Sequence, residues 1–214
     1  MSTVGPIDDI ISLFMIAMIV VSIVGASLFI FLFWRRLKED YSSDIIFSTS
    51  LFTLLGIGLS LAISLYAFSN YWFWISVLGA SVGLLTGIVK YNLRTYEVVE
   101  AAVVSILPWL GIVFFTYAVA YSSLISLVGM GIVVMCLVLF AVLNNHYKRL
   151  SWYKSGRVGF AGITTLGVFF LARALVAIVA NDVLSFIERY EAIVSAAASF
   201  ICFFVVFRLA RKTI

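Results

Sequence analysis

The chain has 214 residues, of which 64% are hydrophobic and 11% charged, and its formal net charge is +4. A soluble domain normally carries roughly a quarter charged residues, so the composition excludes a soluble enzyme or a soluble binding module. A small basic excess on such a chain suits flanks that face anionic lipid, and we expect no nucleic acid binding.

Seven long apolar stretches follow one another along the chain. Each approaches the ~20 residues that a membrane-spanning helix needs, and no connection is long enough for a soluble domain. The sequence therefore predicts an all-α polytopic membrane protein in which residues 1–214 form a single integral membrane domain. The predicted spans are about 10–33, 45–68, 72–89, 101–118, 123–143, 158–179 and 192–207.

The basic residues fall on one side of these spans. Twelve of the fourteen Lys and Arg lie in alternate connections or in the tail: Arg35, Arg36, Lys38, Lys90, Arg94, Lys148, Arg149, Lys154, Arg157, Arg208, Arg211 and Lys212. Two intervening connections, 69–71 and 119–122, carry no charge. Because Lys and Arg accumulate in cytoplasmic loops, the sequence predicts the N-terminus outside and the C-terminus in the cytoplasm.

The third stretch carries Gly79, Gly83 and Gly87 at a spacing that places them on one helical stripe. Small residues at this spacing let two helix backbones approach closely. We interpret the stripe as a helix-packing surface; the alternative is a flat groove for a lipid or a partner helix. At the start of the fourth stretch, Glu97 and Glu100 suit helix capping and interfacial anchoring, because acidic groups favour helix N-termini.

Arg173 is the one charged residue well inside a predicted span. A charge at a helix centre costs ~2.5–3.5 kcal/mol on insertion scales, which makes such a residue a candidate for function. One interpretation is a contact to a lipid phosphate, which an arginine can bind through two N–H groups. The other is a structural role, in which Arg173 pairs with Asp182 or Glu188 in the outer connection or with a buried carbonyl.

Metal or cofactor chemistry is not indicated. The two cysteines, Cys136 and Cys202, lie inside apolar stretches, where a free thiol behaves as a small hydrophobic group. The chain has one histidine, His146. Phosphate-binding, zinc-binding and nucleophile motifs are lacking from the sequence. We therefore predict no metal site, no cofactor and no catalytic residues.

Five segments of the chain resemble, in order, the prolipoprotein diacylglyceryl transferase family. That family moves diacylglyceryl from phosphatidylglycerol to a lipoprotein cysteine. The similar segments are FLFWRRLKEDYS (31–42), LLGIGLSLAISLYAF (54–68), VLGASVGLLTGIVKYNLR (77–94), TYEVVEAAVVSILPWLGIVFFTYAVAY (95–121) and GFAGITTLGVFFLARALVA (159–177). The resemblance implies seven spans with the N-terminus outside, in a bacterial cytoplasmic membrane.

The residues that the family uses for its reaction are largely replaced. Val77-Leu78-Gly79 stands where the family has its active-site histidine, and Val113-Phe114-Phe115 stands where its GRxGNF motif has an arginine. Ser60-Leu61-Ala62 replaces the arginine of the GARLGY motif. Arg173 matches the arginine of the FRF motif, although Ala172 and Ala174 replace its phenylalanines. Acyl-glycerol transfer needs a proton acceptor and a cationic clamp, and this chain retains the clamp at most.

Two functions follow as hypotheses. The first is a non-catalytic relative of this family that acts as a membrane scaffold or an accessory subunit, with a membrane protein or a second copy as its partner. The second is a phospholipid-binding or lipid-modifying enzyme, diacylglyceryl transferase-like, that uses Arg173 for the headgroup of a lipid such as phosphatidylglycerol. A transporter is a weaker alternative, because transport of polar solutes needs more polar groups within the spans.

Overall fold

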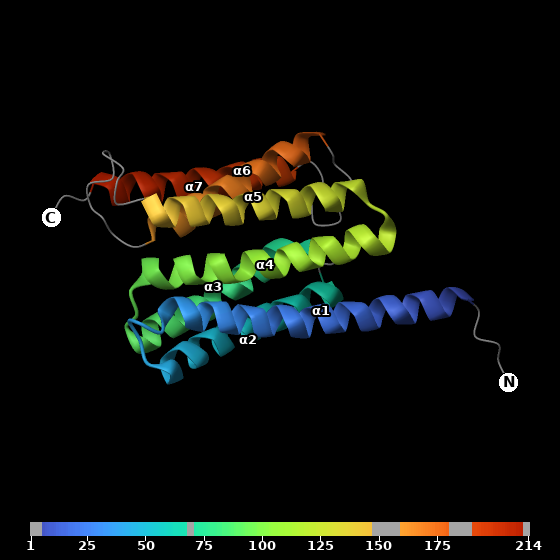
Figure 1. The fold of residues 1–214 in the computed structure, drawn as a ribbon, viewed down its shortest axis with the longest axis horizontal. Helices are drawn as coiled ribbons and strands as arrows, with labels where there is room; N and C mark the ends of the chain where they lie inside the picture. Colours follow the sequence, from blue (N-terminus) through green and yellow to red (C-terminus); the bar gives the residue numbers. More distant parts are fainter. Residues whose placement is uncertain (1–5, 68–70, 147–158, 180–189, 212–214) are drawn as a thin grey trace.

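The computed structural model describes residues 6–67, 71–146, 159–179 and 190–211, with side chains from Ile16 onward (Figure 1). The described residues form seven α-helices in chain order. These are α1 (Pro6–Leu37), α2 (Ser43–Ala67), α3 (Trp72–Tyr91), α4 (Thr95–Tyr121), α5 (Leu124–His146), α6 (Phe160–Val179) and α7 (Glu191–Arg211).

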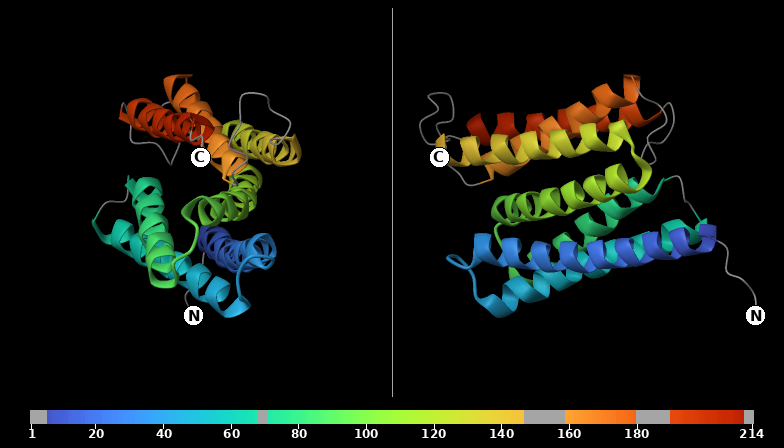
Figure 2. Two further views of the ribbon diagram at one scale, coloured as in Figure 1. Left: turned by 90° about the vertical axis from the view of Figure 1, so that its left-hand side faces the viewer. Right: turned by 45° about the vertical axis from the view of Figure 1, so that its right-hand side comes forward.

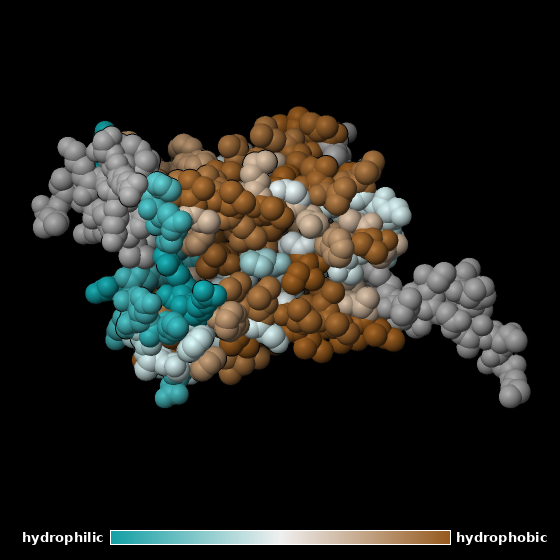
Figure 3. Space-filling model, viewed as in Figure 1, coloured by the Kyte–Doolittle hydropathy of each residue, from teal (hydrophilic) through white to brown (hydrophobic). Residues whose placement is uncertain are grey.

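All seven helices are long and apolar enough to cross a membrane. This confirms the prediction of a multi-pass, all-helical membrane protein, since each predicted span overlaps one helix. The surface agrees with it, because on the face that Figure 3 shows, hydrophilic residues gather at one end and hydrophobic residues cover most of the rest of the described part. We call the hydrophilic end the basic end. It holds the C-terminal ends of α1, α3 and α7.

Helix α4 is the central element of the bundle (Figure 2). It packs against α1, α5 and α6, and to a smaller extent against α3. Two helical hairpins stand on either side of it, α2–α3 and α6–α7, and the helices within each hairpin pack closely together. The chain therefore joins its two halves mainly through α4.

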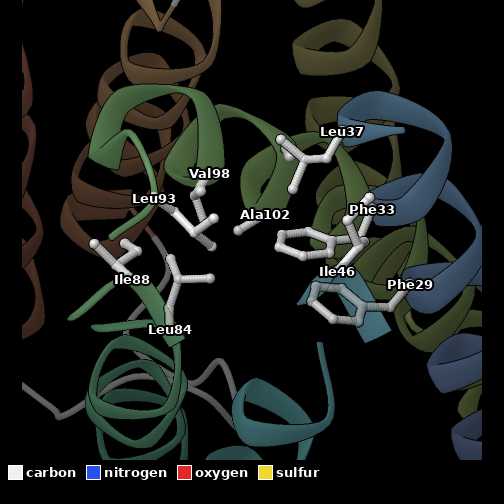
Figure 4. Packing of buried hydrophobic residues seen from close by; sticks show 10 residues of the cluster. Phe29, Phe33, Leu37, Ile46, Leu84, Ile88, Leu93, Val98 and Ala102 are labelled. Carbon is white, nitrogen blue, oxygen red and sulfur yellow. The ribbon is translucent and has the colours of Figure 1, made fainter. Parts of the chain in front are cut away.

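A cluster of apolar side chains holds α1, α2, α3 and α4 together near the basic end (Figure 4). Phe29 and Phe33 of α1 are fully buried, and their rings stack with centroids 5.5 Å apart. They belong to the same cluster as Ile46 of α2, Leu84 of α3 and Val98 of α4. In a membrane, such a cluster stabilises the bundle through close van der Waals packing, because lipid tails are as apolar as these side chains.

The glycine stripe of α3 lies directly against α2. A Cβ built on Gly83 would stand 2.8 Å from the Cα atom of Thr53, and one on Gly79 would stand 2.6 Å from the Cβ atom of Ser60. On Gly87 it would stand 2.5 Å from a methyl carbon of Thr49. The two backbones can approach this closely only where the side chain is a hydrogen atom. The stripe therefore packs against α2.

Candidate functional site

Arg173 forms a buried ion pair with Glu191. Arg173 lies in α6 and is 6% exposed, whereas Glu191 is the first residue of α7 and is fully buried. The Nε atom of Arg173 donates to Oε1 of Glu191 at 2.5 Å. The packing of α6 against α7 brings together two residues that are 18 positions apart. The charge that the sequence singled out thus has an acidic partner from the adjacent helix.

Further side chains from α3 and α7 complete what we call the Arg173 cluster: Phe73, Trp74, Arg173, Glu191 and Ser195. Trp74 Nε1 donates to Oε2 of Glu191 at 2.9 Å, and Ser195 donates to Oε1 at 2.6 Å. The guanidinium carbon of Arg173 lies 3.6 Å from the ring centroid of Phe73, which is a cation–π contact. The cluster therefore joins α3, α6 and α7.

An aromatic stack extends this contact between the two hairpins. The rings of Trp74 and Phe170 are nearly parallel, with centroids 5.5 Å apart. Offset aromatic pairs of this kind contribute ~0.5–1.5 kcal/mol beyond the area they bury. Trp74 thus holds α3 against α6 through its ring and against α7 through its N–H group.

The other candidate partners of Arg173, Asp182 and Glu188, lie outside the described residues. Glu191 lies one residue before the predicted span 192–207 and was not among the predicted partners. A signal was present in the chain, because Arg173 lies six residues before the end of α6, or ~9 Å at 1.5 Å per residue. An acidic residue at the start of the following antiparallel helix was therefore within reach.

A second buried carboxylate, Glu100 of α4, lies near the basic end and is 2% exposed. Arg36 of α1 forms an ion pair with its Oε1 atom through an Nη nitrogen. The same nitrogen donates to Oδ1 of Asn144 in α5 at 2.9 Å. This pair ties α1, α4 and α5 together at one level of the bundle.

Glu100 also caps the N-terminus of α6. Its Oε2 atom accepts hydrogen bonds from the backbone N–H groups of Gly159 and Gly162, at 3.0 and 3.2 Å. The first N–H groups of a helix have no partner within the helix, and its dipole favours a negative charge there. We name Arg36, Glu100, Asn144, Gly159 and Gly162 the Glu100 cluster. The prediction that Glu100 anchors its own helix at the interface is therefore wrong, because the carboxylate is buried against α6.

Two glycines make the Glu100 cluster sterically possible. A Cβ on Gly162 would stand 2.6 Å from the Cα atom of Glu100, so α6 can approach α4 only with glycine at this position. Gly159 has a φ of +110°, which side chains disfavour strongly. In this conformation, the backbone N–H group of Gly159 donates to the carboxylate of Glu100.

Tyr41, which lies between α1 and α2, forms a third polar group with Arg94 and Glu97. Its hydroxyl donates to Oε2 of Glu97 at 2.9 Å and accepts from the backbone N–H of Arg94 at 3.1 Å. Burial raises the pKa of the Tyr41 hydroxyl from its usual value, and Glu97 raises it further, whereas the N–H group of Arg94 acts in the opposite direction. Tyr41 is therefore neutral at physiological pH.

The described residues offer no metal site, since no three His, Cys, Asp or Glu side chains lie together among them. His146, at the end of α5, is exposed, and its Nδ1 atom lies 2.9 Å from the carbonyl oxygen of Val142. Both buried carboxylates accept hydrogen bonds from an arginine and from other N–H or O–H donors. Each carboxylate therefore links helices through several hydrogen bonds at once.

Comparison of the chain with protein-family models, with curated proteins and with solved structures finds no match.

Proposed function

We propose that the protein is a non-catalytic integral membrane protein that acts as a scaffold or an accessory subunit of a membrane complex. The observation that carries the proposal is the use of its buried charges. Arg173 and Glu191 join α3, α6 and α7, while Arg36 and Glu100 join α1, α4, α5 and α6. These charges hold helices together, which is what a rigid membrane platform requires.

The positions at which the resemblance expects catalytic groups support the same proposal. Val77 and Phe114 both pack against an apolar cluster that includes Phe73, Val103 and Phe169. A histidine or arginine at either position would lie among these side chains. We place the protein in the cytoplasmic membrane of a bacterium, with its N-terminus outside, on the resemblance and the distribution of basic residues.

A transfer assay tests the absence of catalysis. Purified protein is mixed with vesicles of phosphatidylglycerol and a peptide that carries a lipoprotein-type cysteine, and the peptide is analysed by mass spectrometry. We expect no diacylglyceryl thioether, whereas an active transferase in the same vesicles provides the positive control. Product formation by this chain, lost in the Arg173→Gln variant, would overturn the proposal.

The assembly state tests the role as a subunit. Membranes are solubilised with a copolymer that cuts out native lipid discs, so that weak contacts survive, and the particle mass is compared with the 23.7 kDa of the chain. We expect a defined particle with a second protein or a second copy at fixed stoichiometry. A single chain surrounded by lipid alone would contradict this role.

The second candidate function, a phospholipid-binding or lipid-modifying protein, is tested by the same preparation. It requires the headgroup phosphate to reach Arg173, which lies against the carboxylate of Glu191. If Arg173→Gln loses a bound phospholipid at unchanged thermal stability, this second function is favoured. If the variant keeps the lipid and unfolds at a lower temperature, Arg173 is structural.

A further inference from the structure

The C-terminal half of α7 presents one continuous exposed stripe. Its members follow at intervals of three or four residues, which places them on one face of an α-helix. They are Phe200, Phe204, Phe207, Arg208 and Arg211, and all five are exposed. The opposite face of α7 carries the buried residues Ser195, Ser199, Val206 and Leu209. The stripe therefore faces away from the bundle.

The two arginines lie back over the phenyl rings of the stripe. The guanidinium carbon of Arg211 lies 4.3 Å from the ring centroid of Phe207, and that of Arg208 lies 5.7 Å from the centroid of Phe204. Side chains of a helix lean toward its N-terminus, so the two arginines lean toward the phenylalanines of the stripe. Phe200 and Phe204 stack in turn, with centroids 6.4 Å apart.

These arginines differ in their partners from three others in the chain. Arg36, Arg94 and Arg173 each form an ion pair with a glutamate. Among the residues that the structure describes, Arg208 and Arg211 form no ion pair, and each guanidinium lies over an aromatic ring. Each guanidinium carries five N–H donors in a planar fork that matches the oxygens of a phosphate.

We propose that this stripe is a binding site for an anionic phospholipid. Arg208 and Arg211 hold the phosphate of the headgroup, and an acyl chain lies along Phe200, Phe204 and Phe207. Two cations that form no ion pair within the described part of the chain favour a lipid of net negative charge, because a choline group would meet the same positive charge. The site is distinct from Arg173, which lies six residues before the C-terminal end of α6. The proposal does not depend on the proposed scaffold function.

Native mass spectrometry of the whole protein in a mild detergent tests the site. Phosphatidylglycerol is titrated against the wild type and against Arg208→Gln/Arg211→Gln. The matched control is Lys38→Gln/Lys90→Gln, because these lysines lie at the same end of the molecule and also contact aromatic rings, Trp34 and Phe52. We expect the arginine variant to bind the lipid at least about tenfold more weakly, the loss expected for removing one charged hydrogen bond, and the control to change less than about threefold.

Three results would overturn the proposal. Equal weakening in both variants would show that only net charge matters. Equal binding of phosphatidylcholine and phosphatidylglycerol would exclude selection of an anionic headgroup. Displacement of the lipid by millimolar inorganic phosphate would show that the phenylalanine stripe contributes nothing. Should the glutamine variant fail to fold, Arg208→Lys/Arg211→Lys decides, because it keeps both charges and loses the planar fork; undiminished binding by it would also reject the site.

Discussion

At the scale of single residues, two glutamates of α4 lie three positions apart in different environments. Glu97 pairs with Arg94, whose side chain is mostly exposed, whereas Glu100 is buried beneath Arg36 and the start of α6. An exposed pair contributes ~0–1 kcal/mol, but removing one partner of a buried pair strands the other and costs ~3–5 kcal/mol. Position in the bundle decides which of the two carboxylates matters for stability.

We predict that Glu100→Gln lowers the free energy of unfolding by about 3 kcal/mol, the low end of the buried range, because the Arg36 side chain is 32% exposed. Glu97→Gln is the matched control, on the same helix and with the same change in charge, and should cost less than about 1 kcal/mol. Chemical denaturation in detergent micelles, followed by tryptophan fluorescence, measures both. Similar losses for the two variants would show that Glu100 is not a special anchor.

The Arg173–Glu191 pair leads to a prediction about coupling. Arg173→Gln and Glu191→Gln should each destabilise the protein by about 3–5 kcal/mol, because each leaves a buried charge unmatched. The double variant leaves no charge and should therefore lose much less than the sum. A double-mutant cycle of unfolding free energies gives the coupling energy. If the two effects simply add, Arg173 finds its main stabilising partner elsewhere.

At the scale of helices, α2 and α3 depend on glycine where their backbones meet. Not every glycine in these helices has this role: a Cβ on Gly58 of α2 would meet no atom within 4 Å, whereas one on Gly83 would lie well within van der Waals contact of the Phe52 carbonyl. Both glycines lie in apolar helical sequence and cannot be told apart by composition. The distinction exists only in the packed hairpin.

We predict that Gly83→Ala destabilises the protein by about 1–3 kcal/mol, the usual cost of overpacking, since backbone atoms must move to admit the methyl group. Gly58→Ala should be neutral or stabilise by up to about 1 kcal/mol, because alanine favours the helix and the site is open. Thermal melting of both variants in one detergent distinguishes them. A loss at Gly58 equal to that at Gly83 would refute the assignment of the contact.

Helix positions were predictable from the sequence because a span must be apolar over ~20 residues. The ends of the helices were harder to predict, since the hydrogen bonds of a helix backbone continue through polar residues. Helix α4 begins at Thr95 and α7 at Glu191, which brings Glu97, Glu100 and Glu191 into helices. For that reason Arg173 was recognised as unusual while its partner was missed. The role of Glu100 depends on α6, 59 residues away at Gly159, and no local pattern reveals it.

At the scale of the whole molecule, the basic end sets an expected orientation. Ser42 lies exposed at this end, and Ser123 lies at the opposite end between α4 and α5. In a background without Cys136 and Cys202, we predict that Ser123→Cys in intact cells reacts with a membrane-impermeant maleimide. Ser42→Cys should react only after the membrane is opened, because basic flanks remain in the cytoplasm. The reverse pattern would invert the proposed topology.

The pairing of Arg173 with Glu191 also constrains how the chain is made. During synthesis, α6 leaves the ribosome ahead of Glu191, so until Glu191 follows, its arginine bears the cost of an unmatched charge in hydrocarbon. Only 18 residues later does the compensating acid arrive. We therefore expect the last two helices to enter the membrane as one unit. Nascent chains truncated before residue 191 should insert α6 less efficiently in a translocon assay than chains extended through α7. The ion pair that stabilises the folded bundle thus also sets how long the nascent chain must be before α6 inserts efficiently.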